Sequence, residues 1–256
     1  MYIRGRARKL EHDKDAHSHS DIDGRKFDHL KKAYQRLEEV YRELRESHME
    51  MILRLAIAAE YRDPDTGSHI IRVSDYAAEL GRMIQLPEKD VETLRAASPM
   101  HDIGKIAIPD RILLKKGKLT PKEYEEMKEH AAIGARMFEN SKSPILRAAS
   151  EIAFTHHEKY DGSGYPRGLK GDAIPIFGRI VAVVDVFDAI ASKRPYKKER
   201  PFKETMEHIK TLAWNHLDPQ LVFHFVKNQD RIHQIYTASK SIESFVAESE
   251  EAALNE

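Results

Sequence analysis

Two short stretches of the chain combine histidine, aspartate and glycine at a spacing that packing alone does not explain. The first is HDIGKIAIPD, which opens with the adjacent pair His101-Asp102. The second is HHEKYDGSGYP at residues 156–166, which opens with His156-His157. Imidazole and carboxylate are ligands that hard-to-borderline divalent metals prefer. The two stretches therefore predict a metal site of the kind that metal-dependent hydrolases use.

Further residues of the right types could complete such a site. Asp65 and His69 are four positions apart, so both would project from one face of a helix. His101 and Asp102 cannot share a helical face, but they can converge at a helix end, where Gly104 indicates a turn. Asp185 interrupts an apolar segment, where an unpaired carboxylate would be costly and a metal ion is the simplest partner.

Each of these residues also has a structural interpretation. His130 could be a packed or surface histidine. Asp65 could stabilise a helix start through the helix dipole, and Asp185 could pair with Arg179 or Arg194. The metal prediction therefore depends on the joint pattern. Four other histidines show no such context and are interpreted as structural or surface residues: His208, His216, His224 and His233.

Helices are the elements that must position these side chains. Helix starts are expected at Asp63-Pro64, with a helix to about Met83, and at Pro87, Thr120-Pro121, Pro144 and Pro175. The helix from Pro144 should run into His156, and the one from Pro175 to about Ser192. Two more are expected near 201–214 and 218–237. No stretch alternates between apolar and polar residues, so the chain is predicted to be all-α with little or no sheet.

An N-terminal segment shows a heptad pattern. Its apolar residues are three and four positions apart, and Lys, Arg and Glu flank them. They are Phe27, Leu30, Tyr34, Leu37, Tyr41 and Leu44, followed by Met51, Leu55 and Ala58. The pattern predicts a parallel dimeric coiled coil over residues 25–59 that could carry a signal; the alternative is an amphipathic helix lying on its own domain. Residues 1–24 are expected to be a disordered polar tail, and 238–256 a C-terminal tail.

Composition narrows the possible functions. Lys plus Arg and Asp plus Glu both number 42, so the net charge is zero and argues against binding a nucleic acid polymer. Cysteine is absent, which rules out disulfides and thiolate metal sites and fits a reducing cytosol. No apolar run is long enough for a membrane span. We expect a cytoplasmic protein.

Several motifs in order resemble the HD-GYP domain, a subgroup of the HD phosphohydrolase superfamily, over about residues 50–237. They are EYRDPDTGSHIIRV at 60–73, MHDIGKI at 100–106, EHAAIGARM at 129–137, HHEKYDGSGYP, RIVAVVDVFDAI and RPYKK. The resemblance implies a helical HD-domain bundle, taken as residues 60–237, after the long N-terminal helix. It also implies a bacterial phosphodiesterase that hydrolyses cyclic di-GMP to pGpG or GMP with two or three metal ions, usually iron or manganese.

The resemblance also implies residue roles. It makes metal ligands of His69, His101, Asp102, His130, His156, His157 and Asp185. Asp65 stands where members with three metals have Glu, so we expect a third ion, held by a shorter side chain. Lys105, Arg194 and Lys197 would contact phosphate, and Tyr165 of the GYP triplet would lie near the substrate. Asp102 would bridge two metals that acidify a water for attack on phosphorus, with Lys105 and Arg194 neutralising phosphate charge.

Some alternatives remain open at this point. Asp188 could support a ligand or a basic side chain, or form only a helix salt bridge. Glu158 could support the site or be exposed. The loop at 161–171 should shape substrate access, and the family links it to contacts with cyclic di-GMP synthases. Rival functions are a phosphohydrolase acting on another nucleotide, and a non-catalytic module that binds cyclic di-GMP or a partner and signals through the coiled coil.

Overall fold

The computed structural model describes residues 3–60, 68–192 and 200–239, with only the backbone described for residues 3–26 and 60. The chain forms two compact units, Met1–Met51 and Ile52–Glu256. Within the described ranges the named elements are all helices, and the single β-bridge joins Ala213 and Leu217. The all-α prediction is confirmed for this part of the chain.

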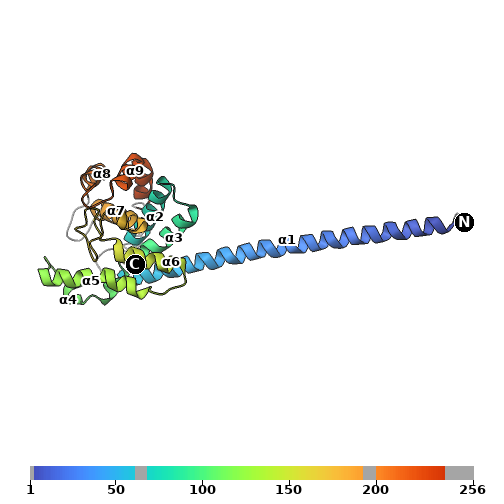
Figure 1. Ribbon diagram of the computed structural model, residues 1–256, viewed down its shortest axis with the longest axis horizontal. Coiled ribbons are helices and arrows are strands. Elements are labelled where there is room, and N and C mark those ends of the chain that lie inside the picture. The colour runs from blue at the N-terminus through green and yellow to red at the C-terminus, as the bar shows by residue number, and fades with distance from the viewer. Residues whose placement is uncertain (1–2, 61–67, 193–199, 240–256) are drawn as a thin grey trace, which may run out of the picture. The chain divides into compact units, whose positions relative to one another are not determined.

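The helices follow one another in the order labelled in Figure 1. The α-helices are α1 (Ile3–Glu60), α2 (Ser68–Met83), α3 (Glu88–Ala97), α4 (Asp110–Leu113), α5 (Pro121–Met137), α6 (Pro144–Thr155), α7 (Ile176–Ala191), α8 (Phe202–Thr211) and α9 (Pro219–Lys227). Short 3₁₀ helices are η1 (Ser98–Met100), η2 (Ile103–Ala107) and η3 (Gly171–Ala173). Residues 229–239 are helical as well.

Most predicted helix starts lie where the prolines indicated. Thr120 caps α5 through a capping box: its hydroxyl accepts from the Glu123 amide at 3.3 Å, and the Glu123 carboxylate accepts from the Thr120 amide at 2.7 Å. Pro144 begins α6, and Pro175 directly precedes α7. The start predicted at Asp63-Pro64 lies outside the described residues, but that helix ends at Met83 as expected.

Two sequence-based expectations differ from the structure. The helix expected over 218–237 is interrupted at Asn228, whose side-chain amide donates to the His224 carbonyl at 2.8 Å and so competes with the helical hydrogen bonds. Residues 3–24, expected to form a disordered tail, are helical. That segment contains no proline and only two glycines within it, Gly5 and Gly24, so nothing in it forces the helix to end.

The predicted heptad residues of α1 are exposed. More than half of each is accessible to solvent for Phe27, Leu30, Tyr34, Leu37, Tyr41, Leu44, Met51 and Leu55. The second unit begins at Ile52, earlier than the boundary expected at residue 60, because Ala56 and Ala59 are buried in its core.

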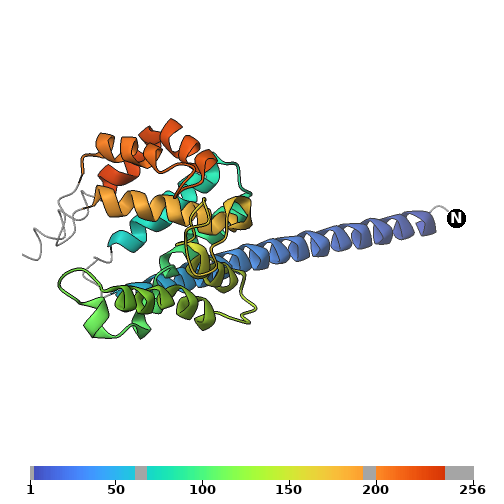
Figure 2. The same ribbon diagram turned by 60° about the vertical axis from the view of Figure 1, so that its left-hand side comes forward.

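The core of the second unit is built around α7, which packs against α2, α6, α8 and α9 (Figure 2). The ring of Phe187 on α7 makes edge contacts with Tyr76 on α2 and Phe225 on α9, with centroids 5.2 and 5.1 Å apart. Apolar residues cover almost the whole of α7 because it is buried on several sides. Asp185 and Asp188 are its two carboxylates, and the packing fixes where they lie.

Candidate metal centre

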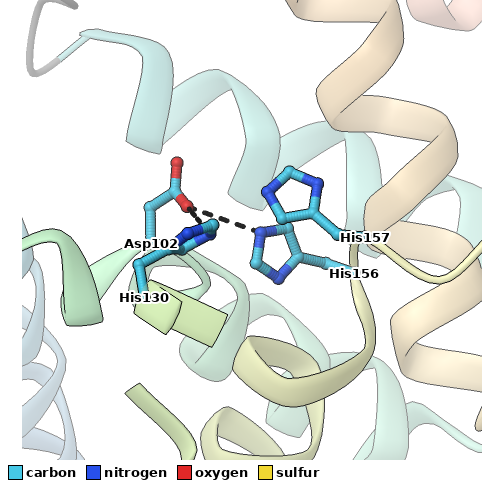
Figure 3. A group of neighbouring side chains, drawn as sticks. All are labelled: Asp102, His130, His156 and His157. Atoms are coloured by element: carbon cyan, nitrogen blue, oxygen red, sulfur yellow. Dashed lines mark ion pairs between the residues drawn. The ribbon is translucent and has the colours of Figure 1, made fainter. Parts of the chain in front are cut away.

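All seven ligands expected within the described residues gather in two groups, each with its ligand atoms within 4.8 Å of one another. The first, which we call the Asp102 group, contains Asp102, His130, His156 and His157 (Figure 3). The second, the His69 group, contains His69, His101 and Asp185. The sequence predicted this convergence from segments up to 116 residues apart, from His69 to Asp185.

A close approach of two elements brings Asp102 to His130. The chain leaves α3 through η1, so His101 and Asp102 lie between η1 and η2, at the helix end that Gly104 indicated. A Cβ atom on Gly104 would lie 2.0 Å from the His130 carbonyl oxygen, so only glycine allows η2 to pack this closely on α5. As a result, Asp102 Oδ1 lies 3.1 Å from His130 Nε2 and 3.4 Å from His156 Nε2.

Backbone carbonyls orient three of the imidazoles. The Nδ1 atom of His101 lies 2.9 Å from the Ser98 carbonyl oxygen, and that of His130 lies 2.7 Å from the Met127 carbonyl. The Nδ1 atom of His156 is 3.1 Å from the carbonyls of Ile152 and Ala153. Because a carbonyl only accepts, we assign the proton to Nδ1 in each ring. The Nε2 lone pairs then point into the site, as in metal-ligating histidines.

Three polar atoms in the Asp102 group are buried without a hydrogen-bond partner among the described residues. Asp102 Oδ1, His130 Nε2 and His156 Nε2 are inaccessible to solvent, and across the described ranges none has a partner with hydrogen-bond geometry. Leaving such atoms unsatisfied costs on the order of 1–3 kcal/mol each. A divalent cation would satisfy all three, so the residues fit a metal ion.

The electrostatics favour the protonation states that a metal needs at three residues of the Asp102 group. Burial lowers the pKa of His156 and holds the pKa of His157 well below its ordinary value. Burial alone would raise the pKa of Asp102, but the Lys105 ammonium holds it well below its usual range. Lys105 Nζ lies 2.8 Å from Asp102 Oδ2. Neutral His156 and His157 rings near an ionised Asp102 are ready to ligate without first losing protons.

Asp188 supports the His69 group from behind. Its Oδ2 accepts from His69 Nδ1 at 2.7 Å, while Arg72 donates to both carboxylate oxygens at 2.6 and 2.9 Å. Asp188 therefore serves both of the functions left open by the sequence, a ligand's partner and a partner of a basic side chain. Burial alone would raise its pKa, but these hydrogen bonds lower the pKa of Asp188 to about 2. His69 Nε2 in turn faces Asp185 Oδ1 at 3.5 Å.

The alternative pairing of Asp185 with Arg179 is not what the structure shows. Arg179 instead donates to Asp172 at 2.6 Å and to Asp218 at 2.7 Å, linking the loop after α6 to the start of α9. Asp185 lies with His69 and His101, with its Oδ1 4.0 Å from His101 Nε2. The carboxylate in this apolar helix therefore belongs to the metal-competent group.

Asp102 lies between the two groups. Its Oδ1 faces His130 and His156, and its Oδ2 lies 3.5 Å from His101 Nε2 of the other group. The His101 ring is also an edge neighbour of both His69 and His156, with centroids 5.5 and 5.2 Å apart. One carboxylate can therefore serve two adjacent ions, which is the arrangement of a two-metal hydrolytic site.

Glu158 holds the glycine-rich loop beside the centre. Only 1% of this residue is exposed, and its carboxylate accepts from the amides of Arg167 at 2.8 Å and Leu169 at 2.9 Å. The loop carries Tyr165 to His157: the Tyr165 amide donates to the His157 carbonyl at 3.2 Å, and the two rings lie 4.7 Å apart at 31°. The sequence left the role of Glu158 open.

The sequence-based interpretation missed two residues on α5. The Tyr124 ring makes an edge contact with Tyr165, with centroids 6.5 Å apart. Lys128 Nζ lies 5.5 Å from the centroids of both rings. The available signal was the four-residue spacing of Tyr124 and Lys128 on the helix that supplies His130, which puts the pair on one face.

Three predicted site residues cannot be placed. Asp65, Arg194 and Lys197 lie outside the described residues. Their roles in binding a third metal and phosphate remain predictions. The four histidines interpreted as structural or surface residues belong to neither group.

Comparison with known proteins identifies similar sequences. The sequence model described as "HD domain" matches residues 39–221. The chain is 46% identical to a cyclic di-GMP phosphodiesterase of Thermotoga maritima, over 79% of this chain and 55% of that protein. It is 44% identical to 3′3′-cGAMP-specific phosphodiesterase 2 of Vibrio cholerae, over 70% of this chain and 34% of that protein. It is 42% identical to the cyclic di-GMP phosphodiesterase response regulator RpfG of Xanthomonas campestris pv. campestris, over 78% of this chain and 53% of that protein.

These relatives are longer proteins, and the chain spans about half of their length or less. A solved structure of a cyclic GMP-AMP-specific phosphodiesterase of V. cholerae aligns with a TM-score of 0.56 and 20% identity, over 75% of this chain and 50% of that one. The HD-GYP-type protein Bd1817 of Bdellovibrio bacteriovorus aligns with a TM-score of 0.53 and 16% identity, over 75% of this chain and 64% of that one. At these identities the likeness shows a shared fold. Among the described helices, none is both long and apolar enough to cross a membrane.

Proposed function

The chain belongs to the HD domain family, and on that premise we propose that it is a metal-dependent phosphodiesterase that hydrolyses cyclic di-GMP to pGpG or GMP. The observation that carries the proposal is the position of Asp102, whose two oxygens face the two groups of metal-competent side chains. Relatives named cyclic di-GMP phosphodiesterases support the choice of substrate.

The described residues would hold two ions. The ligands would be His69, His101, Asp102, His130, His156, His157 and Asp185. When bound, the ions would activate water and offset negative charge on the phosphate. The nitrogen and oxygen donors are compatible with several divalent ions, and the resemblance to HD-GYP domains implies iron or manganese. Asp65 would contribute to a third ion.

The protein's own residues would bind and orient the phosphodiester. Lys105 holds its ammonium 2.8 Å from Asp102 Oδ2, so its charge would lie beside a phosphate placed at the ions. Arg194 and Lys197 would add further contacts to the phosphate oxygens. Tyr165, fixed against His157 by the loop, would line the substrate path. The carbonyls behind His101, His130 and His156 would keep the imidazoles in the orientation needed to hold the ions.

A second substrate has a specific observation in its favour. The relative named as 3′3′-cGAMP-specific is 44% identical, almost as similar as the first cyclic di-GMP phosphodiesterase. The two dinucleotides differ in one base and share the phosphodiester that the centre would cleave. Incubating the iron- or manganese-loaded chain with each dinucleotide and separating the products by chromatography tests the proposal. Faster turnover of cyclic di-GMP supports the proposal. If only 3′3′-cGAMP were turned over, 3′3′-cGAMP would take the place of cyclic di-GMP as the proposed substrate.

We also propose that the chain is a cytoplasmic homodimer joined through residues 25–59. The exposed row of apolar side chains on α1 supports the dimer, because a second copy of the helix would bury it in heptad packing. The resemblance noted above adds a cyclic di-GMP synthase as a partner for the loop at 161–171.

A further inference from the structure

Three aromatic rings form a path that leads away from the metal centre. The His157 ring, a member of the Asp102 group, lies 4.7 Å from the Tyr165 ring at a small angle of 31°. Tyr165 then meets Tyr124 edge to face, with centroids 6.5 Å apart. Tyr124 is 49% exposed, so the path ends on a ring that is accessible to a ligand.

The ammonium group of Lys128 lies close to the rings of Tyr124 and Tyr165. Lys128 follows Tyr124 by one helical turn on α5, and its Nζ lies 5.5 Å from the centroids of Tyr124 and Tyr165. The same Nζ is 2.7 Å from Glu125 Oε2 on the same helix, which keeps the ammonium near the helix surface. His130 also lies on α5, so the same helix positions both Lys128 and a member of the Asp102 group.

We propose that Tyr124 is a stacking platform for one purine base of the substrate, with Lys128 providing positive charge beside the stacked base and its phosphate. The proposal rests on the proposed function, because it assumes that a cyclic dinucleotide places a phosphodiester at the metal centre. A base attached to that phosphate would lie within about one nucleotide of the ions, and Tyr124 is two ring contacts away from His157. Base–aromatic stacking with a nearby cation is the usual way to bind such a base.

The alternative role for Tyr124 is to pack against Tyr165 and fix its position. Packing against Tyr165 leaves part of Tyr124 unused, since 49% of the residue is exposed and within reach of a ligand. Lys128 Nζ lies over the Tyr124 ring, so a base would stack on the opposite face. Burial by a base would cover an aromatic surface that the described residues leave open.

The test compares Tyr124→Ala and Tyr124→Phe with a matched control. Phe223 on α9 is 56% exposed and has Lys227 over its ring at 5.6 Å, one helical turn away, so Phe223→Ala removes an equivalent pair elsewhere. On the metal-loaded chain we expect Tyr124→Ala to raise KM for cyclic di-GMP by about ten- to a hundred-fold. Metal content and kcat should stay close to native values, and Tyr124→Phe and Phe223→Ala should behave like the native chain.

An unchanged KM in Tyr124→Ala would overturn the inference. A fall in metal content or kcat with no change in KM would also overturn it, because Tyr124 would then act through the centre. Equilibrium binding, measured on the same samples, separates this test from that of the proposed function. If the native chain binds cyclic di-GMP but forms no product, the phosphodiesterase proposal fails, and weaker binding by Tyr124→Ala still supports the platform. If the native chain binds neither cyclic di-GMP nor 3′3′-cGAMP, the platform fails as well.

Discussion

At the scale of single residues, the imidazoles of the centre are oriented by hydrogen-bond partners on the side away from the candidate metal site. Carbonyls fix the tautomers of His101, His130 and His156, while Asp188 does the same for His69. A carboxylate behind a histidine raises its basicity and orients its ring, whereas a carbonyl mainly orients. His69 therefore depends on its partner more than the other imidazoles do.

Replacing Asp188 tests this dependence. We expect Asp188→Asn to weaken metal affinity about ten- to a hundred-fold, because the amide cannot supply the charge that Asp188 gives to His69 and Arg72. Titration of the metal-free chain with Mn²⁺ measures the change. Asp75→Asn is the control, since Asp75 pairs with Arg95 on the surface of α2. Equal affinities for the native chain and Asp188→Asn would contradict the supporting role.

The same residue predicts an acid sensitivity of the metal-free chain. The pKa of Asp188 is lowered to about 2 in the folded state, from an ordinary value of 3.8. A lowered folded-state pKa stabilises the fold above the unfolded pKa, and this stabilisation disappears as the pH falls from about 4 to 2. We expect it to be on the order of 2 kcal/mol in the free energy of unfolding.

Urea unfolding in the presence of a chelator, at a series of pH values between 5 and 2, measures this sensitivity. Asp188→Asn should lack this part of the pH dependence, because it has no carboxyl group to protonate. If the native chain and the variant lost stability in parallel over this range, the lowered pKa would be contradicted.

At the scale of elements, the loop at 161–171 depends on one buried carboxylate. Glu158 accepts from two loop amides that lie nine and eleven residues away, and it thereby fixes the path that carries Tyr165 to His157. Close packing adds to this, because a Cβ on Gly164 would lie 2.2 Å from the Lys159 amide nitrogen. The backbone path of this loop beside the centre is therefore fixed by hydrogen bonds and close packing.

We predict that Glu158→Gln impairs substrate binding through Tyr165. A glutamine can accept from one amide, but its NH₂ group would face the other amide, at a cost of about 1–3 kcal/mol. We expect a KM for cyclic di-GMP at least fivefold higher with unchanged metal content, while Glu139→Gln, an exposed change after α5, has no effect. In a Tyr165→Ala background the effect should disappear, as a double-mutant cycle would show. Equal effects in both backgrounds would contradict an action through Tyr165.

The sequence predicted which residues gather at the centre, and most of the helices, better than it predicted what supports these residues. Residue type and the joint pattern of the motifs indicated His69, His101, Asp102 and Asp185, because imidazole and carboxylate are ligands that divalent metals prefer. The partners of Asp188 and Glu158 could not be chosen, since Asp188 meets Arg72 across 116 residues of sequence. The break at Asn228 was missed because a side-chain bond to the preceding turn leaves no mark on apolar periodicity.

At the scale of the whole molecule, an HD domain and a heptad-patterned helix occur in one chain. The match to the HD domain family begins at residue 39, within α1, and extends to residue 221. The apolar residues of the helix recur as in a coiled coil, and they are exposed in the single chain. A second copy of the chain would be the simplest partner for them.

The dimer proposal predicts the effect of a charge in the heptad seam. Leu37→Glu should shift the chain towards monomer, because the carboxylate would be buried opposite its symmetry mate. Gln35→Glu adds the same charge outside the seam and should leave association unchanged. Sedimentation equilibrium measures both. A native chain that is monomeric at micromolar concentration, or a Leu37→Glu variant as dimeric as the native chain, would contradict the proposal.

The most direct test of the central claim measures metal content and cyclic di-GMP turnover on one anaerobic, iron- or manganese-loaded preparation of the native chain and of Asp102→Ala. The position of Asp102 between the two groups predicts at least two equivalents of metal and the formation of pGpG or GMP by the native chain. It also predicts that Asp102→Ala loses both the metal and the activity. Retained turnover by a metal-free Asp102→Ala chain would contradict the account.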